Sequence, residues 1–249
     1  MAETNLRRTK SQQIADDLKA AIERGEHGPG DRLPGENALA TQYGVAPLTA
    51  RQALKSLATE GLVEIKKGAG ARVISFHPIR RRGIQRVARE QWGEGKSIWS
   101  ADDDRPQTID VRVDSLTAPT YIARVLDLAE GELVCARSRR YMVEERPVML
   151  AVSYLPYALV EGSAITRVDT GDGGIYARLA ELGHAPAHFR EELRSRLPTS
   201  EEAAGLEMPA ERPVIKLCRT AFDQEGRAVE VNEMTLDSAA YVLDYDFDA

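Results

Sequence analysis

The chain has 249 residues, of which 43% are hydrophobic and 29% charged, as is typical of a globular protein long enough for two domains. No apolar run approaches the roughly 20 residues that span a bilayer, and no apolar segment follows the charged N-terminus. We therefore expect a cytoplasmic protein with no signal peptide and no membrane partner. Cys135 and Cys218 lie far apart and match no metal-binding spacing, and we expect neither a metal nor another cofactor.

Charge is distributed unevenly along the chain. The formal net charge is −6, which by itself argues against a nucleic-acid partner. Residues 1–82, however, contain 14 Lys and Arg against 9 Asp and Glu, whereas the remainder contains 19 against 30. A basic module on an acidic body is expected if only the first part contacts phosphate.

The first 60 residues predict three short helices, over residues 11–24, 36–43 and 47–60. Ser11 is the expected cap of the first helix, whose apolar residues recur at helical spacing. Gly35 precedes the second helix and Gly44 ends it. Pro47 opens the third helix, where its missing N–H costs no helical hydrogen bond. The second and third helices, joined by a tight glycine-containing turn, form a helix-turn-helix.

A β-hairpin is predicted directly after the third helix. Leu62–Lys67 and Ala71–Ile74 have strand character, and Gly68–Gly70 forms the tip between them. We call this hairpin the wing. Residues 76–97 carry no clear core pattern and are interpreted as a linker, with a helix expected at Ile84–Trp92. Whether the Arg80–Arg82 run contacts DNA or is a solvated face is left open.

The second half of the chain is rich in strands. They are predicted over residues 108–113, 133–143, 148–155, 188–197, 213–223 and 228–236, with helices over 119–126, 174–182 and 200–206. Turn signals at Glu144–Pro147 and Gln224–Arg227 favour hairpins and therefore a mainly antiparallel sheet with helices packed on it, an α+β domain. The expected domains are 1–75, the linker 76–97, and 98–249.

Short motifs follow one another in order through residues 11–75. They are Gln13-Ile14-Ala15, Pro29-Gly30-Asp31-Arg32-Leu33-Pro34, Glu36, Gly44-Val45, Thr49-Ala50-Arg51-Gln52-Ala53-Leu54 and Glu60-Gly61-Leu62. Together they resemble the α/β winged helix-turn-helix of the GntR family of bacterial regulators. The resemblance implies sequence-specific binding to double-stranded operator DNA.

A second set of motifs runs through residues 108–247. They are Arg137-Ser138-Arg139, Pro147, Ser153-Tyr154-Leu155-Pro156, Gly173-Gly174-Ile175-Tyr176, Gly183-His184, Arg219-Thr220 and Gly226 through Glu230. They resemble the UTRA domain, which defines the HutC subfamily of GntR regulators. This resemblance implies a chorismate-lyase-like α+β fold that binds a small effector without catalysis. It also implies a homodimer on a two-fold-symmetric operator.

The part of the helix-turn-helix that carries the expected base-contacting residues, which we call the reading head, departs from the family pattern at three places. Family members commonly have Ser-Arg where this chain has Ala46-Pro47. They often have an arginine at the position of Asn37 and a serine at that of Gly35. Because usual DNA-contacting arginines and a capping hydroxyl are absent, the operator sequence of other members does not transfer to this chain.

The first residues of the third helix are the expected base readers, because the N-terminal end of a recognition helix reaches base edges in the major groove. Arg51 suits a guanine or a phosphate, and Gln52 suits adenine. The alternative is a solvated helix face. The full set expected to contact DNA is Arg32, Glu36, Leu48, Thr49, Arg51, Gln52, Lys55, Lys67, Gly68 and Arg72.

Alternating polar residues mark a candidate effector site in the second half. Arg137, Arg139 and Tyr141 share one face of a predicted strand, which is either a sheet edge in water or the wall of an anion pocket. Arginine suits a phosphate or carboxylate, and glutamate suits an amine or hydroxyls. The resemblance to UTRA domains implies that the effector-binding residues are Arg137, Arg139, Tyr141, Ser153, Tyr154, Glu230 and Asn232.

The expected function is a transcriptional regulator, a repressor released by a small polar or anionic metabolite, and not an enzyme. The alternatives are an effector-independent repressor and an enzyme using the lyase-like domain. His184 and His188 have metal-like spacing, but Pro186 lies between them and no zinc motif accompanies them. Gly171–Gly174 lacks the lysine and the spacing of a phosphate loop, so we interpret it as a turn before a helix.

Overall fold

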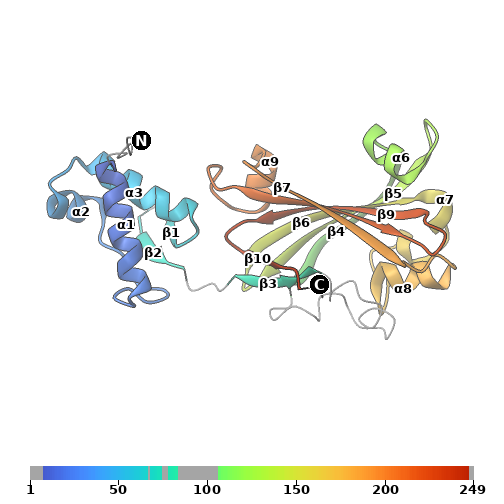
Figure 1. Cartoon of the computed structure of the whole chain (residues 1–249), viewed down its shortest axis with the longest axis horizontal. Helices are drawn as coiled ribbons and strands as arrows, with labels where there is room; N and C mark the ends of the chain where they lie inside the picture. Colours follow the sequence, from blue (N-terminus) through green and yellow to red (C-terminus); the bar gives the residue numbers. More distant parts are fainter. Residues whose placement is uncertain (1–7, 67, 75–77, 84–105, 247–249) are drawn as a thin grey trace, which may run out of the picture. The chain divides into compact units, whose positions relative to one another are not determined.

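A computed structural model describes residues 8–66, 68–74, 78–83 and 106–246 (Figure 1). The chain divides between His77 and Pro78 into two compact units. Most of the predicted linker, including the helix expected at Ile84–Trp92, lies outside the described residues. Ile79–Arg82, however, form strand β3 of the second unit, which corrects their assignment to a linker. The domain limits at residues 75 and 98 stay predictions.

Three helices form the core of the first unit. They are α1 (Lys10–Glu23), α2 (Glu36–Tyr43) and α3 (Pro47–Thr59). Ile14, Leu39 and Leu57 are completely buried in one cluster, because their helical spacing brings the apolar face of each helix to the same centre. The cap of α1 is Thr9 rather than the expected Ser11, since the Thr9 hydroxyl accepts from the backbone N–H of Gln12.

The wing follows α3 as predicted, in antiparallel strands β1 (Val63–Lys66) and β2 (Gly70–Val73). The segment before α2 lies along β2: the backbone N–H of Leu33 donates to the carbonyl of Ala71 over 2.9 Å. Val63 and Val73 face the helices and are buried with the core. These contacts attach the wing to the helix-turn-helix.

A six-stranded antiparallel sheet forms the body of the second unit, in the order β4-β5-β6-β9-β8-β7. The strands are β4 (Gln107–Thr117), β5 (Leu133–Val143), β6 (Arg146–Pro156), β7 (His188–Arg196), β8 (Val214–Phe222) and β9 (Ala228–Asp237). Two three-stranded meanders meet where β6 pairs with β9. The antiparallel α+β prediction is confirmed.

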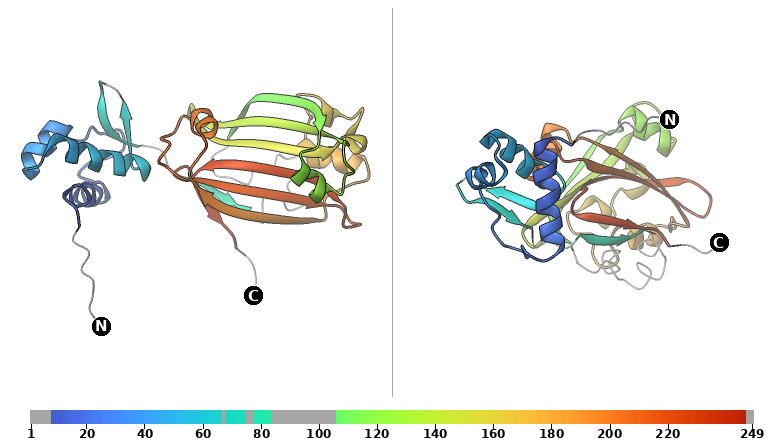
Figure 2. Two further views of the ribbon diagram at one scale, coloured as in Figure 1. Left: turned by 90° about the horizontal axis from the view of Figure 1, so that it is seen from above. Right: turned by 60° about the vertical axis from the view of Figure 1, so that its left-hand side comes forward.

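Helices cover both faces of this sheet (Figures 1 and 2). The second unit contains α6 (Thr120–Leu126), α7 (Tyr157–Val160), the 3-10 turn η2 (Ala164–Thr166), α8 (Gly174–Glu181) and α9 (Ser200–Gly205). Ile165 of η2 and Leu179 of α8 pack on the face of β5 that carries Cys135. Ile122 and Val134 bury α6 on the opposite face. The two faces therefore have different partners, and we name them the α8 face and the α6 face.

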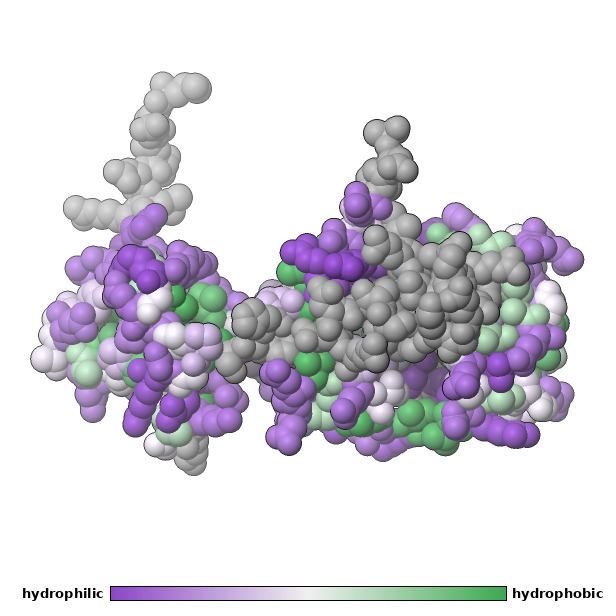
Figure 3. Space-filling view, turned by 90° about the horizontal axis from the view of Figure 1, so that it is seen from below, coloured by the Kyte–Doolittle hydropathy of each residue, from purple (hydrophilic) through white to green (hydrophobic). Residues whose placement is uncertain are grey.

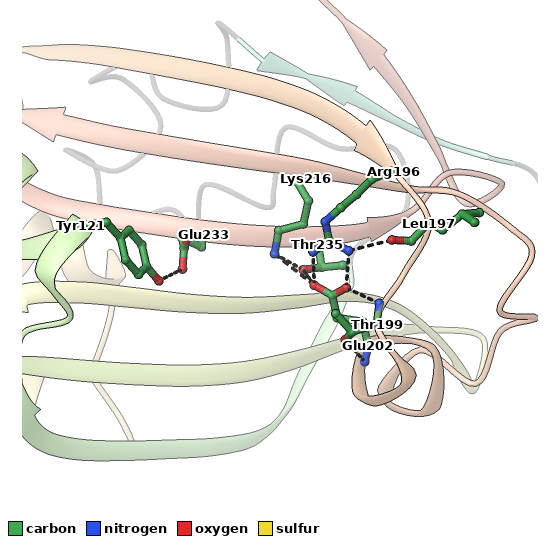
Figure 4. Close-up of polar contacts among 8 residues, drawn as sticks. All are labelled: Tyr121, Arg196, Leu197, Thr199, Glu202, Lys216, Glu233 and Thr235. Carbon is green, nitrogen blue, oxygen red and sulfur yellow. Dashed lines mark hydrogen bonds and ion pairs between the residues drawn. The ribbon is translucent and has the colours of Figure 1, made fainter.

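Polar contacts attach α9 to the α6 face (Figure 4). Thr199 and Glu202 form a capping box at the start of the helix. Glu202 also accepts from Arg196 over 2.7 Å and from Lys216 over 3.3 Å. The hydrogen bonds from Arg196, from the backbone N–H of Thr199 and from Lys216 hold the pKa of the Glu202 carboxyl near 2, although burial alone would raise it. The capped start of α9 is thus also an anchor to the sheet.

Strand β3 pairs in parallel with β10 (Tyr241–Asp244), the last strand of the chain. The backbone N–H of Ile79 donates to the carbonyl of Ala240 over 2.8 Å. A parallel pair of this length is not predictable from residues 79–82 alone, because its partner lies some 160 positions later in the sequence.

Candidate functional site

The start of α3 presents side chains to solvent in the way that major-groove reading requires. Leu48 is 62% exposed, and Gln52 and Lys55 are exposed on the same helix, whereas Thr49 is half-buried. The α3 N-cap is Ala46, which has no side-chain oxygen to accept a backbone N–H. Pro47 has no N–H, and the N–H groups of Thr49 and Ala50 donate to the carbonyl of Ala46, so in this first turn the Leu48 N–H is the group that a DNA phosphate could bind.

An ion pair joins the two helices of the helix-turn-helix. The guanidinium of Arg51, on α3, donates from Nε to both carboxylate oxygens of Glu36, each over 2.9 Å. Its Nη2 lies 2.8 Å from Glu36 Oε2. The hydrogen bond from Arg51 lowers the pKa of the Glu36 carboxyl. Glu36 thus holds one edge of the guanidinium, while the side chain of Arg51 stays 55% exposed.

Two arginines lie side by side where the segment before α2 runs along the wing. Arg32 and Arg72 form an isolated antiparallel bridge, and Arg72 Nη1 donates to the carbonyl of Gly30 over 3.0 Å. The guanidinium of Arg32 passes over Gly70, where a Cβ would lie 3.2 Å from its Nε. Gly68 at the tip is exposed with φ +80°. Lys67, predicted to contact DNA, lies outside the described residues.

These side chains form two exposed basic sites, the start of α3 and the wing, within one small unit. Hydrophilic residues cover most of the surface of this unit in the view of Figure 3. Guanidinium and ammonium groups of this kind bind phosphates, and the side chains at the start of a helix reach base edges. The arrangement is suited to double-stranded DNA.

A cavity of about 570 Å³ opens on the α8 face of the sheet in the second unit. Its walls come from β4, β5, β9 and the segment that leads into α8. The lining residues are Thr108, Val111, Arg137, Arg139, Tyr141, Val168, Asp169, Thr170, Gly171, Asp172, Gly173, Gly174, Ile175, Tyr176, Glu230 and Asn232. Five of the seven predicted effector residues are among them, since they alternate along β5 and β9 toward one face.

Arg137 is 3% exposed and holds the pocket wall together. Its guanidinium donates to the backbone carbonyls of Ile165 and Arg167, and over 3.0 Å to that of Val168. Burial and the neighbouring charge of Arg139 lower the pKa of Arg137. Two adjacent guanidinium groups, for which the described residues provide carbonyl and hydroxyl partners but no bonded carboxylate, make this end of the pocket electropositive.

Four buried polar atoms of the pocket have no hydrogen-bond partner among the described residues. They are Arg137 Nε, Arg139 Nε, Glu230 Oε2 and Asn232 Oδ1. Each buried polar group left unpaired costs about 1–3 kcal/mol of folding free energy, so in native proteins water or a ligand normally forms a hydrogen bond with it. Donors and acceptors are both present, so a ligand with an anionic group and hydroxyls or an amine would satisfy them.

The other two predicted effector residues lie elsewhere. Ser153 is on the α8 face but fully buried, and its hydroxyl accepts from Arg139 Nη2, so it orients Arg139 rather than lining the cavity. Tyr154 does not line the cavity as predicted, because it packs with Ile122 on the α6 face. The physical reason is the two-residue period of a strand, which sends Ser153 and Tyr154 to opposite faces.

The segment Asp169–Tyr176 lines the cavity, although its sequence does not predict this position. Gly171, Gly173 and Gly174 all have positive φ, between +67° and +77°, and carry the chain along the pocket rim into α8. The glycines were interpreted correctly as a turn before a helix. Their position over β5 depends on tertiary contacts, which the local sequence pattern does not specify. Thr108 and Val111, brought in by a β-bulge between Ile109 and Arg112, were missed for the same reason.

The two candidate metal histidines are separated by the fold. His184 Nδ1 lies 3.0 Å from Asp223 Oδ2, whereas His188 is at the start of β7 with its ring 5.6 Å from that of Phe222. In the part of the chain that the structure describes, no three His, Cys, Asp or Glu side chains are grouped to hold a metal ion. No helix there is long and apolar enough to cross a membrane.

A winged helix-turn-helix followed by a sheet domain with a polar cavity defines a class, the DNA-binding transcriptional regulators with a ligand-binding domain. Residues 10–73 match the model of the bacterial regulatory proteins of the gntR family, and residues 101–241 match that of the UTRA domain. The chain belongs to the GntR family, and its UTRA domain fits the HutC subfamily.

Known transcriptional regulators are similar to this chain over most of their own length. An HTH-type transcriptional regulator of Streptomyces coelicolor is 31% identical, over 96% of this chain and 92% of its own. The HTH-type transcriptional repressor NagR of Bacillus subtilis is 26% identical, over 88% of this chain and 86% of its own. The crystal structure of PhnF from Mycobacterium smegmatis has a TM-score of 0.58 at 26% identity, covering 95% of this chain and 99% of that one.

Proposed function

We propose that this regulator is a repressor that binds a two-fold-symmetric operator as a homodimer and is released by a small anionic metabolite. The observation that carries the release step is the pocket with two adjacent arginines at one end and unpartnered buried donors and acceptors in its wall. A relative named as a repressor, NagR, supports the direction of regulation. In this proposal the second unit binds a ligand and carries out no reaction.

Operator recognition is assigned to the start of α3 and to the wing. Arg51 reads a base, because Glu36 fixes one edge of its guanidinium and leaves the other groups exposed. The other base-contacting residues in this proposal are Leu48, Thr49 and Gln52. Phosphates are bound by Lys55, Arg32 and Arg72.

The first test replaces Arg51 by alanine. Losing a bidentate base contact costs about 1–3 kcal/mol, so we expect specific operator affinity to fall by about tenfold or more, with little change on unrelated DNA. Gel-shift titration on the protein's own promoter region measures both. Arg24→Ala, which removes an exposed arginine at the end of α1, is the control. Unchanged operator affinity in Arg51→Ala overturns the assignment.

The ligand class follows from the chemistry of the cavity walls. Arg137 and Arg139 suit a phosphate or carboxylate, and Glu230 with Asn232 suits hydroxyls or an amine. A ligand releases the operator only if it binds the two conformations of the protein with different affinity.

The second test screens phosphorylated and carboxylated metabolites by thermal shift, followed by operator release in a gel shift. Arg139→Gln is expected to abolish the response, and Arg194→Gln, an exposed arginine of β7, to preserve it. Binding without release indicates an effector-independent repressor. Turnover of a ligand indicates an enzyme.

The homodimer is tested separately by sedimentation. The chain mass is 27.4 kDa, and the proposal requires a species of twice this mass at the concentrations that bind the operator. A monomer at those concentrations contradicts it.

A further inference from the structure

A row of polar side chains crosses the sheet from the pocket to the β7 edge. In the strand register Arg137 faces Ser153, Ser153 faces Asn232, Asn232 faces Arg219, and Arg219 faces Glu191. Directly paired residues of neighbouring strands lie on the same face with their Cβ atoms about 4.5–5.5 Å apart. We call these five residues the polar row. Two of them, Arg137 and Asn232, line the pocket.

The far end of the row binds the first strand of the second unit. Arg81 of β3 is fully buried, and its Nη2 donates to Glu191 Oε1 over 2.8 Å. Arg219, 1% exposed, donates from Nε to the same oxygen over 2.8 Å. Glu191 therefore lies between two buried guanidinium groups, one on β8 and one on β3.

Tyr176 connects the pocket to this cluster. Its side chain lines the cavity from α8, and its hydroxyl interacts with Glu230, which lines the same cavity, and with Arg219, which is paired across the sheet with the lining residue Asn232. Burial and the negative charge of Glu230 raise the pKa of Tyr176, whereas the charge of Arg219 lowers it. A ligand that pairs with Glu230 or Tyr176 changes the hydrogen bonding of Arg219, because these groups share donors and acceptors.

Strand β3 depends on this cluster for its position. It has four residues and pairs only with the four-residue β10 among the described strands. A two-stranded pair is marginal without further packing. Among the described residues, the contacts of β3 include the ion pair of Arg80 with Asp244 of β10, the pairing of the buried Arg81 with Glu191 of β7, and Gly83, which directly follows the strand. A Cβ on Gly83 would lie 2.5 Å from the ring of Tyr245, whose hydroxyl donates to Glu191 over 2.7 Å.

We infer that Arg81 and Glu191 are positioning residues that couple the pocket to β3, the strand through which the chain passes from the DNA-binding unit into the body. Filling the pocket changes the contacts of Tyr176 and Arg219, these change how Glu191 holds Arg81, and β3 becomes more or less firmly attached. The inference rests on the proposed function for its ligand. The coupling itself is a property of the unliganded chain and can be tested without a ligand.

The experiment measures amide hydrogen exchange of residues 79–82 in the full-length protein without ligand. Tyr176→Phe keeps the ring packed against Phe189, whose centroid is 5.3 Å away, and removes only the hydroxyl. We expect exchange of the β3 amides to change by at least about fivefold, the lower end of typical coupling between sites. Tyr157→Phe, in the same core cluster but outside the row, is the matched control.

A second pair of variants separates coupling from simple support of β3. Glu191→Gln should accelerate β3 exchange, whereas Glu192→Gln, its exposed neighbour on β7, should not. If Tyr176 acts through Glu191, the double variant Tyr176→Phe/Glu191→Gln exchanges like Glu191→Gln alone. Additive effects, or no effect of Tyr176→Phe on β3, overturn the inference and leave Glu191 a structural residue.

Inorganic phosphate serves as the probe of the liganded state. We expect it to alter β3 exchange in the wild type and to lose this effect in Glu191→Gln while still protecting the Asp169–Tyr176 segment. Phosphate that protects this segment in both proteins and never alters β3 overturns the coupling. Phosphate that protects neither counts against the anion pocket of the proposed function, and the ligand-free variants still decide the coupling.

Discussion

Glu36 and Arg51 show how one residue pair sets the reading head of the first unit. Ala46 and Pro47 stand at the start of α3 and have no side-chain donor, so Arg51 is the arginine that this helix offers for base contacts. The carboxylate that binds Arg51 Nε then restricts the orientation of the guanidinium. A preoriented guanidinium loses less side-chain entropy on binding, which favours specificity.

Glu36→Gln is therefore predicted to lower the ratio of specific to non-specific DNA affinity by about three- to tenfold. Specific binding weakens because the charge-assisted hydrogen bonds to Arg51 are lost. Non-specific binding strengthens because a negative charge near the phosphates is removed. Gel shifts on operator and on unrelated DNA measure the ratio, and Glu26→Gln, an exposed carboxylate that is paired with Arg24, is the control. A ratio equal to that of the wild type counts against a role for Glu36.

Glu191 illustrates a buried charge in the second unit. Burial raises the pKa of its carboxyl, but the positive charges of Arg219 and Arg81 prevail and bring it to about 2. Because the pKa is depressed from 4.5 in the unfolded chain, the stabilisation is complete above that value and is lost as the pH falls toward 2.

We predict that the free energy of unfolding of the wild type decreases between about pH 5 and pH 2 by up to about 3 kcal/mol through this group. Glu191→Gln lacks this contribution, so it is less stable at neutral pH and its curve converges with that of the wild type near pH 2. Denaturant titrations across this range measure it. Parallel curves for the two proteins would falsify the assignment of the shift to Glu191.

At the scale of elements, the three helix starts of the first unit differ in their capping. Thr9 forms a capping box with Gln12, whereas Gly35 and Ala46 provide no side-chain cap for α2 and α3. Four N–H groups at each helix start lack helical partners, and a side-chain oxygen normally satisfies one of them. The recognition helix thus begins without a side-chain cap.

Ala46→Ser is predicted to stabilise α3 by about 1 kcal/mol, because the backbone at Ala46 already has the extended conformation of an N-cap. Amide exchange in α3 should slow by about fivefold in the full-length protein. Ala46→Val, which offers no acceptor, is the matched control. If both substitutions have the same effect on α3, capping is not the cause.

For the whole molecule, the separation of charge predicts how salt acts on DNA binding. Lys and Arg outnumber Asp and Glu in residues 1–82 and are outnumbered by them in the rest of the chain. The phosphate contacts should therefore come from the first unit alone, and the net charge of the chain should have little influence on the salt dependence.

Lys55→Gln should reduce the slope of log affinity against log salt by about 0.9, since one phosphate contact is lost. Lys19→Gln changes the net charge equally but removes a lysine of α1 that pairs with Glu60 over 2.9 Å, so its slope should match the wild type. Affinities at several salt concentrations between about 50 and 200 mM give the slopes. Equal slopes for the two variants would show that net charge, not a specific contact, controls binding.

The sequence by itself determined the three helices, the wing, the strands of the sheet and the family. These features are local: helical spacing, turn glycines, alternation along strands and ordered motifs all lie within short segments. The α2 bounds and those of β5 agree with the prediction residue for residue. Five of the residues predicted to bind an effector line the cavity, because alternation along β5 and β9 defines which side chains share a face.

Only the tertiary structure decided what depends on contacts between distant segments. The face to which Tyr154 points, the position of Asp169–Tyr176 over the cavity and the pairing of β3 with β10 are examples. So are the five residues of the polar row, which come from five strands and meet only through sheet register. A strand pattern gives alternation but not the absolute face or the register of its partners, because packing of the whole sheet sets both.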